Sequence, residues 1–332
     1  MNLCENCFND EEIQTSIRNY NQKGDCELCG AHNSYIIDID EFDDFFNEIL
    51  NLFEINENGV DIVAFIQSEW DLFSNSNFAN QILKYFIEKH RISYTLNDKV
   101  AYINEIHKYT AQWTELKHEI RVKTRFYSSL MAYFDENGSL LKSNMTLEMG
   151  SQFYRARIIP AGKSYLTKKD MGCPPAEKAT SGRANPIGIP YLYLCKLPET
   201  TLYETRSVYL DKVTIGTFRL VKNLDILDFT ASTSLFLAFN EDVELREAIA
   251  QHLLRQQISK DLSKPLRRYD TELEYVPTQS VCEYCKLKDI DGIIFRSSLH
   301  KDGLNLVLFD ANSAECIKVK TVEVDKVEIA YK

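Results

Sequence analysis

Two pairs of cysteines near the start of the chain restrict its fold more than any other feature. Each pair has two residues between its cysteines, and 18 residues separate the pairs. This spacing is typical of a structural zinc site, because each short gap lets one tight turn direct two thiolates at the same ion. The predicted zinc ligands are Cys4, Cys7, Cys26 and Cys29. Since four thiolates fill the coordination shell, we expect a structural zinc, and residues 1–35 are predicted to form a zinc ribbon that needs the metal to fold.

The acidic side chains are concentrated in the front part of the chain. Residues 1–135 carry 23 acidic and 11 basic side chains, whereas residues 136–332 carry 26 acidic and 27 basic ones. An acidic front makes nucleic acid an improbable partner, because contacts to phosphates need Lys and Arg. The simplest interpretation of the acidic face is that it keeps the protein soluble. The nearly neutral back part is compatible with a pocket for a small anionic ligand.

The sequence predicts neither a membrane segment nor a secretory signal. No apolar run approaches the roughly 18 residues that a membrane helix needs. The first residues lack the basic stretch followed by an apolar stretch that marks a signal peptide. We therefore expect a cytoplasmic location.

Apolar residues between the zinc ribbon and the middle of the chain repeat with a helical period. Six of them from Phe42 to Phe53 form one stripe, with acidic and amide side chains opposite, and predict a single helix. Further helices are predicted over 60–73 and 80–90, and a long one contains Ile103 to Ile120. Residues 36–135 are accordingly predicted to form an acidic, all-α domain packed as a small bundle.

From residue 150 the pattern changes to short runs rich in β-branched and aromatic residues. Strands are predicted over 153–159, 191–195, 213–220, 224–229, 293–296 and 304–309. Helices are predicted at about 198–207, 233–259 and 277–287. Strands that are mixed irregularly with helices indicate an α+β domain over 150–332.

Several polar residues of this back part stand out by their positions. Arg155 and Arg157 alternate along a predicted strand and therefore share one face. A glycine-bearing loop over 181–188 precedes the next strand, Glu204 lies in a helical stretch, and Ser297 follows a predicted strand. Taken singly, a strand arginine is usually part of a surface ion pair and a helical glutamate is usually solvated. Their functional interpretation depends on the order in which they occur.

The motifs that contain these residues resemble the RES family, which is named for a recurring arginine, glutamate and serine. They occur in the family's order: Phe153-Tyr154-Arg155; Gly182-Arg183-Ala184-Asn185-Pro186-Ile187-Gly188; Leu192-Tyr193-Leu194 with Leu202-Tyr203-Glu204; Leu224 to Thr230; Tyr275 to Gln279; and Asp291-Gly292 with Ser297 and Asn305 to Phe309. Ala184 stands where the family often has tryptophan. The resemblance implies an ADP-ribosyltransferase-like split β-sheet with NAD, the substrate, in its cleft.

The resemblance also implies the residues that act on NAD. It places the family's arginine, tyrosine, glutamate and serine on Arg155, Tyr193, Glu204 and Ser297. Cleavage of the bond to nicotinamide makes the ribose oxocarbenium-like, and the Glu204 carboxylate would stabilise that charge. Arg155, or as second choice Arg183, would bind the diphosphate. Tyr193 would stack on nicotinamide, and Ser297 would hydrogen-bond its amide or the ribose.

Two further expectations concern the back part. The remaining residues predicted to bind NAD are Arg183, Tyr191, Arg157 and Gln279. Cys282 and Cys285 have the spacing of a zinc knuckle, but no second pair lies nearby and the surrounding run is helical. We expect them to be small buried side chains on one helix turn.

The front part resembles the helical HEPN region of RES proteins that carry a zinc ribbon. The resemblance rests on the cysteine pairs, the acidic helices and the stretch from Trp113 to Tyr127. Active HEPN ribonucleases have an arginine followed at short distance by a histidine. Arg91, Arg121 and Arg125 have no histidine at that spacing. We therefore expect no nuclease activity.

Three functions remain open at this point. The first is an enzyme that degrades NAD by hydrolysis or phosphorolysis, as a toxin of a toxin–antitoxin or defence system with an antitoxin or regulatory partner. The second is an ADP-ribosyltransferase that modifies a protein or other macromolecule. The third is a non-enzymatic, zinc-dependent interaction module that senses NAD. The fate of labelled NAD distinguishes them.

Overall fold

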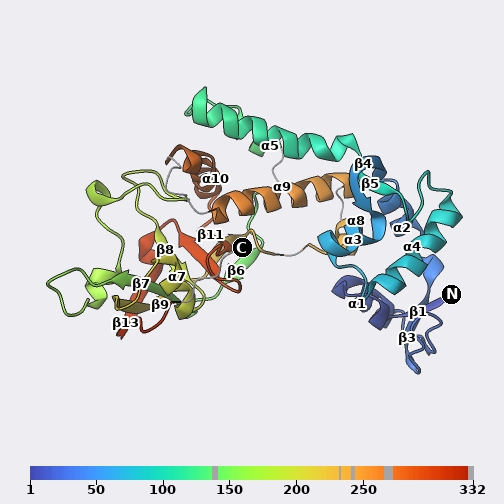
Figure 1. The fold of residues 1–332 in the computed structure, drawn as a ribbon, viewed down its shortest axis with the longest axis horizontal. Helices are drawn as coiled ribbons and strands as arrows, with labels where there is room; N and C mark the ends of the chain where they lie inside the picture. Colours follow the sequence, from blue (N-terminus) through green and yellow to red (C-terminus); the bar gives the residue numbers. More distant parts are fainter. Residues whose placement is uncertain (137–140, 232, 241–243, 265–271, 328–332) are drawn as a thin grey trace. The chain divides into compact units, whose positions relative to one another are not determined.

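The chain forms two compact units (Figure 1). The computed structural model describes residues 1–136, 141–231, 233–240, 244–264 and 272–327. Unit 1 comprises Met1–Gln112 and Ser232–Leu254, and unit 2 comprises Trp113–Ala231 and Arg255–Lys332. Both units are therefore discontinuous in sequence. This division differs from the three predicted domains, whose boundaries stay a prediction.

The first part of unit 1 is a small antiparallel sheet around the cysteine pairs. Its strands lie in the order β1-β3-β2. The elements are β1 (Asn2–Cys4), the 3-10 helix η1 (Glu5–Cys7), α1 (Glu11–Asn19), β2 (Lys23–Gly24) and β3 (Ser34–Asp38). α1 begins after Asp10 because the carboxylate of Asp10 accepts hydrogen bonds from the free backbone N–H groups of Glu12 and Ile13. The same carboxylate accepts a hydrogen bond from Ser234 Oγ at 2.8 Å, so the chain that returns after unit 2 is tied to the start of α1.

The rest of unit 1 contains the predicted helices and also two strands that were not predicted. The elements are η2 (Ile39–Phe42), α2 (Asp43–Leu50), β4 (Phe53–Asp61), α3 (Ile62–Trp70), α4 (Ser76–His90), β5 (Lys99–Tyr102), α8 (Leu235–Asn240) and parts of α5 (Asn104–Val122) and α9 (Leu245–Ser263). The helix predicted through Phe53 ends at Leu50, because Phe53 begins β4, which pairs antiparallel with β5. The helix predicted from Val60 begins at Ile62, because the Asp61 side chain caps it by accepting from Ala64 N.

Aromatic side chains fill the core of unit 1. Phe46 is fully buried and stacks on Phe86, with ring centroids 4.4 Å apart, and on Phe73 at 6.2 Å. Phe236 of α8 packs edge-on against Phe45 at 5.0 Å. Offset and edge-on ring pairs of this kind add to the stabilisation that burial of their area provides.

Unit 2 contains an eight-stranded mixed sheet in the order β13-β9-β7-β8-β12-β11-β10-β6. The strands are β6 (Met145–Leu147), β7 (Gln152–Ile158), β8 (Leu192–Cys195), β9 (Lys212–Leu220), β10 (Leu224–Asp228), β11 (Gly292–Arg296), β12 (Leu304–Leu308) and β13 (Ala314–Glu323). β7 and β8 share a single pair of residues in register, Tyr154 with Cys195, so the sheet opens at this point. The predicted α+β class is confirmed.

Besides the C-terminal parts of α5 and α9, unit 2 contains α-helices and short 3-10 helices. They are α6 (Leu130–Glu136), η3 (Lys168–Met171), η4 (Ala176–Lys178), α7 (Pro198–Glu204), η5 (Glu272–Tyr275), α10 (Val276–Leu287) and η6 (Ala311–Ser313). α7 contacts β7, β8 and β9, and α10 contacts β11. Cys282 and Cys285 are buried in α10, as predicted. Throughout the described residues, every helix is too short or too polar to span a lipid bilayer.

Candidate active site and metal site

Glu204 is the last residue of α7, and two side chains from the sheet fix its carboxylate. Ser297 Oγ donates a hydrogen bond to Glu204 Oε1 at 2.7 Å, and Asn305 Nδ2 donates one to the same oxygen at 2.8 Å. Ser297 directly follows β11, and Asn305 lies in the neighbouring β12, opposite Phe295. The carboxylate is therefore held by a residue of β12 and by the residue that directly follows β11, at the point where α7 ends.

The hydroxyl of Ser297 is fully engaged. It accepts the backbone N–H groups of Leu299 and His300, both at 3.2 Å, and donates to Glu204. The turn that holds it requires Gly303, because a Cβ there would lie 2.9 Å from Ser297 Cβ. The turn therefore fixes Ser297 as a donor to Glu204.

Asn305 is itself held by a thiol. Its side chain is buried, and Cys195 Sγ on β8 donates to Asn305 Oδ1 at 3.3 Å. Burial, with a smaller contribution from the charge of Glu204, raises the pKa of Cys195 to about 12. The thiol is therefore protonated at neutral pH and acts as a hydrogen-bond donor rather than as a nucleophile.

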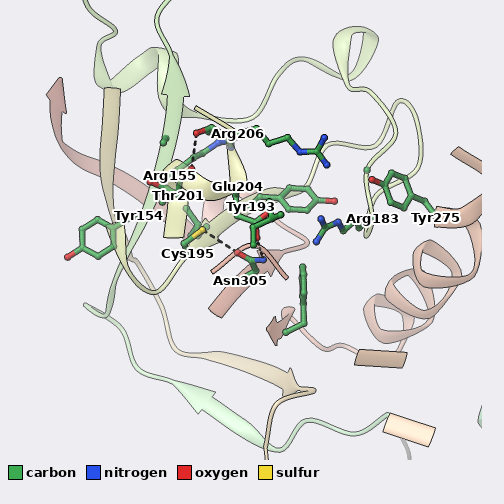
Figure 2. A pocket seen from close by; sticks show the side chains of 16 residues that line it. Tyr154, Arg155, Arg183, Tyr193, Cys195, Thr201, Glu204, Arg206, Tyr275 and Asn305 are labelled. Atoms are coloured by element: carbon green, nitrogen blue, oxygen red, sulfur yellow. Dashed lines mark hydrogen bonds between the residues drawn. The ribbon is translucent and has the colours of Figure 1, made fainter. Parts of the chain in front are cut away.

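Glu204 and Asn305 line a cavity of about 400 Å³ in unit 2, shown in Figure 2. The side chains that line it include one carboxylate and three guanidinium groups, from Arg155, Arg183 and Arg206. The other lining residues are Tyr154, Ala156, Gly182, Tyr193, Leu194, Cys195, Thr201, Thr205, Tyr275, Phe295 and Leu299. The excess of positive charge favours an anionic ligand, and guanidinium groups bind phosphates by paired hydrogen bonds.

The two arginines of β7 lie on the same face of the strand, as their alternation predicts. Arg155 Nη1 lies 4.0 Å from Cys173 Sγ, and Arg157 Nη2 donates to the carbonyl of Gly172 at 2.6 Å. Burial, and then the charge of Arg157, lowers the pKa of Arg155. A guanidinium still keeps its proton in a protein, so burial leaves Arg155 as a poorly hydrated cation that gains from an anionic partner.

Tyr193 and the glycine-bearing loop form one wall of the cavity. Tyr193 OH donates to Asn185 Oδ1 at 2.8 Å and accepts from Ala184 N at 3.1 Å. Gln279 Nε2 donates to the carbonyls of Gly182 and Asn185, at 2.8 and 3.0 Å. Burial raises the pKa of Tyr193, so it stays a neutral phenol. The loop is thus held from one side by Tyr193 and from the other by Gln279.

The structure brings some of the predicted site residues together and separates others. Those that line the cavity are Glu204, Arg155, Tyr193 and Arg183. Ser297 donates a hydrogen bond to Glu204, and Arg157 donates one to the carbonyl of Gly172. Gln279 donates to the carbonyl of Gly182 in the glycine-bearing loop. Tyr191 is buried elsewhere, against Phe309 at 5.0 Å. The roles assigned to these residues from the sequence stay predictions.

Several cavity residues were missed from the sequence. Asn305 is a polar residue in an otherwise apolar strand, and this exception could have marked it as functional. Arg206 adopts a left-handed backbone, φ 51°, just after α7, at a position where glycine is usual. Tyr275 begins one of the family motifs but was not assigned to the site, and Cys195 carries no comparable signal in the sequence.

The four cysteines of unit 1 fit a tetrahedral metal site. Their sulfurs all lie within 4.8 Å of one another, with Cys4 3.4 Å from Cys29, Cys7 3.6 Å from Cys26 and Cys4 3.9 Å from Cys7. A tetrahedron with zinc–sulfur bonds of about 2.3 Å has edges of about 3.8 Å. Burial raises the pKa of Cys4 to about 12, so a cation is needed to hold the thiolate form.

Comparison with known proteins assigns the family. The model of the RES domain matches residues 152–331, more than half of the chain, and the chain therefore belongs to the RES domain family. Among solved structures, a chain of the M. tuberculosis MbcT–MbcA toxin–antitoxin complex is similar, with 14% sequence identity and a TM-score of 0.33. The similarity covers 56% of this chain and 90% of that one. A search of curated proteins finds no match.

Proposed function

We propose that this protein is an enzyme that cleaves the nicotinamide–ribose bond of NAD, releases nicotinamide and transfers the ADP-ribosyl group to water or phosphate. The observation that carries the proposal is a carboxylate, Glu204, held by two donors in a cavity that three arginines also line. NAD has the matching features, a diphosphate and a ribose that becomes cationic as nicotinamide leaves.

Glu204 would stabilise the developing positive charge on the ribose. Ser297 and Asn305 both bind Oε1, and neither uses Oε2. A carboxylate fixed before the reaction pays no reorganisation cost when charge develops beside it. An oxocarbenium-like ribose beside a carboxylate is also the arrangement of glycoside hydrolysis.

The remaining lining residues would bind the rest of NAD. Arg155, with Arg183 as second choice, would hold the diphosphate, because guanidinium groups pair with phosphate oxygens. Tyr193 offers an aromatic face in the cavity for nicotinamide. No protein nucleophile is required, since nicotinamide is already a good leaving group, and this agrees with the protonated thiol of Cys195.

We further propose that the enzyme acts as a toxin of a toxin–antitoxin or defence system. This rests on its membership of the RES family and on what the sequence motifs imply for that family. In this proposal an antitoxin or regulatory partner limits access to the cavity. The cysteine cluster would hold a structural zinc ion, because its sulfur spacing fits that metal.

The test compares nicotinamide release from NAD by the wild type and by Glu204→Gln, which keeps the shape and removes the charge. We expect a fall in rate of about 10²-fold or more, comparable to the loss of a preorganised electrostatic group. Glu199→Gln is the matched control, because Glu199 is an exposed glutamate on the same helix; its rate should equal that of the wild type. Equal rates for Glu204→Gln would contradict the role of Glu204.

Labelled NAD separates the remaining alternatives in the same assay. Free ADP-ribose indicates hydrolysis, and its 1-phosphate, formed in phosphate buffer, indicates phosphorolysis. Label fixed to a macromolecule indicates a transferase. Binding of NAD without any release of nicotinamide would reject the enzyme and leave a sensing module.

A further inference from the structure

We infer that Asn305 is a positioning residue for the carboxylate of Glu204 and that Cys195 sets the orientation of the Asn305 amide. The effect of this positioning on catalysis rests on the proposed function, whereas the effect of Asn305 on the geometry of Glu204 does not. The three side chains form a chain of donors that runs from the thiol through the amide to the carboxylate.

The hydrogen bonds of the Asn305 side chain determine which way its amide group faces. A carboxylate can only accept hydrogen bonds, so the Asn305 group 2.8 Å from Glu204 Oε1 must be the NH₂ group. The amide oxygen then faces Cys195, which lies 3.3 Å away. Because the pKa of Cys195 is raised to about 12, the thiol keeps the proton that this oxygen needs. The reversed amide would direct its oxygen at Glu204 and repel it.

The Asn305 amide gives the Glu204 carboxylate a second hydrogen bond, besides the one from Ser297. One hydrogen bond to a carboxylate oxygen leaves the group free to turn about that contact. Two donors on Oε1, from β12 and from the turn after β11, fix both its place and the direction in which Oε2 points. Catalytic groups must be held close to their productive geometry, because a displacement of about 1 Å can lower the rate about 10²-fold.

Asn305 and Cys195 are both buried. Asn305 is 6% exposed and Cys195 is 6% exposed, so water cannot readily replace either partner. A buried amide oxygen that loses its donor keeps the cost of its desolvation. Changes at Cys195 are therefore expected to reach Glu204 through Asn305, although Cys195 makes no hydrogen bond to Glu204 itself.

The experiment measures kcat and KM for nicotinamide release in variants of both residues. Asn305→Ala should lower kcat about 10- to 100-fold, with KM changed less than about threefold, because the lost interaction acts on the reacting carboxylate. Asn305→Asp has nearly the same shape, lacks the donor and adds a like charge; its kcat should fall at least as far. Asn312→Ala, at an exposed asparagine in the same unit, is the control and should leave both constants unchanged.

Two substitutions of Cys195 separate its role as a hydrogen-bond donor from a merely structural role. Cys195→Ala removes the donor and should lower kcat about tenfold, whereas Cys195→Ser restores a donor and should stay within about twofold of the wild type. Equal losses in both would overturn the role of the thiol. A raised KM with unchanged kcat in Asn305→Ala would overturn the positioning role and assign Asn305 to substrate binding.

A second measurement does not depend on turnover. In crystal structures, Glu204 should keep its contacts in the wild type and in Cys195→Ser and should leave its position in Asn305→Asp. A wild type that releases no nicotinamide would reject the proposed function, and these structures would still decide the positioning. An unmoved Glu204 in Asn305→Asp would overturn the inference whatever the activity.

Discussion

The interior of unit 1 and the cavity of unit 2 are each stabilised by a different kind of interaction. In unit 1, stacked phenylalanines such as Phe46 and Phe86 and four clustered cysteines fix the chain. In the cavity, polar side chains fix one another through hydrogen bonds, as Glu204 and Asn305 do. Apolar burial provides stability that tolerates small shifts, whereas a buried polar network gives direction at the risk of leaving groups unpaired. Substitutions in unit 1 should therefore mainly change stability, whereas substitutions in the cavity should mainly change the kinetic constants.

The largest effect is expected from loss of the proposed zinc ion. Cys7 is fully buried and belongs to the cluster of four cysteines, and structural zinc supplies on the order of 10 kcal/mol of folding free energy in small metal-dependent domains. Cys7→Ser or a strong chelator should therefore unfold the region of β1 to β3. The measurements are zinc content by mass spectrometry and circular dichroism. Cys316→Ser, at a half-buried cysteine of unit 2, should keep the zinc, and full zinc retention in Cys7→Ser would contradict the site.

A smaller loss of stability is expected in the aromatic core. Phe46→Ala removes a fully buried ring from its contacts with Phe86 and Phe73 and should cost about 3–5 kcal/mol in the free energy of unfolding. Chemical denaturation measures this cost. Nicotinamide release per folded molecule should stay at the wild-type value, since the change lies far along the chain from the cavity residues. Tyr127→Ala, at a ring that is 93% exposed, should change stability by less than about 0.5 kcal/mol.

The smallest change in stability, with a clear change in binding, is expected at Gly182. A Cβ there would meet Asn185 Oδ1 and would lie 2.7 Å from Tyr193 OH. Gly182→Ala should therefore displace the loop, raise KM for NAD and cost about 1–3 kcal/mol of stability. Gly172→Ala is the control, because a Cβ there meets nothing within 4 Å. A loss of stability without a change in KM would show that the loop wall takes no part in binding.

Much of the fold was accessible from sequence patterns. The strands with strong β-forming runs were predicted. β4 was not, because Phe53 continues the apolar helical stripe of α2, Val60 falls at the start of the next predicted helix, and the residues between them were assigned to neither a helix nor a strand. β13 was missed because its alternation of charged with small or apolar residues is weak and it lies at the sheet edge. Both errors have one cause. Pairing with a distant strand decides the conformation of such segments, and local patterns do not record the partner.

The site was accessible only in part for the same reason. Arg155, Tyr193 and Glu204 were found because they lie in recognisable motifs, and the structure places all three at one cavity. Asn305 also lies in one of these motifs, but its hydrogen bond to Glu204 was not predicted, since the two residues are 101 apart in sequence and Cys195 is 110 residues from Asn305. Ser297 was found, but its contact with Glu204 was not foreseen. A single sequence gives residue types and local order, and hydrogen bonds across a sheet arise only after folding.

The late position of β11 and β12 has a consequence for the timing of activity. These strands lie between β8 and β10 in the sheet, although both follow β10 in the chain. A nascent chain that ends at β10 already carries Arg155, Tyr193 and Glu204, yet neither donor to the carboxylate has been made. The proposed chemistry therefore requires a chain that extends through β12, and a product that ends before β11 should release no nicotinamide from NAD.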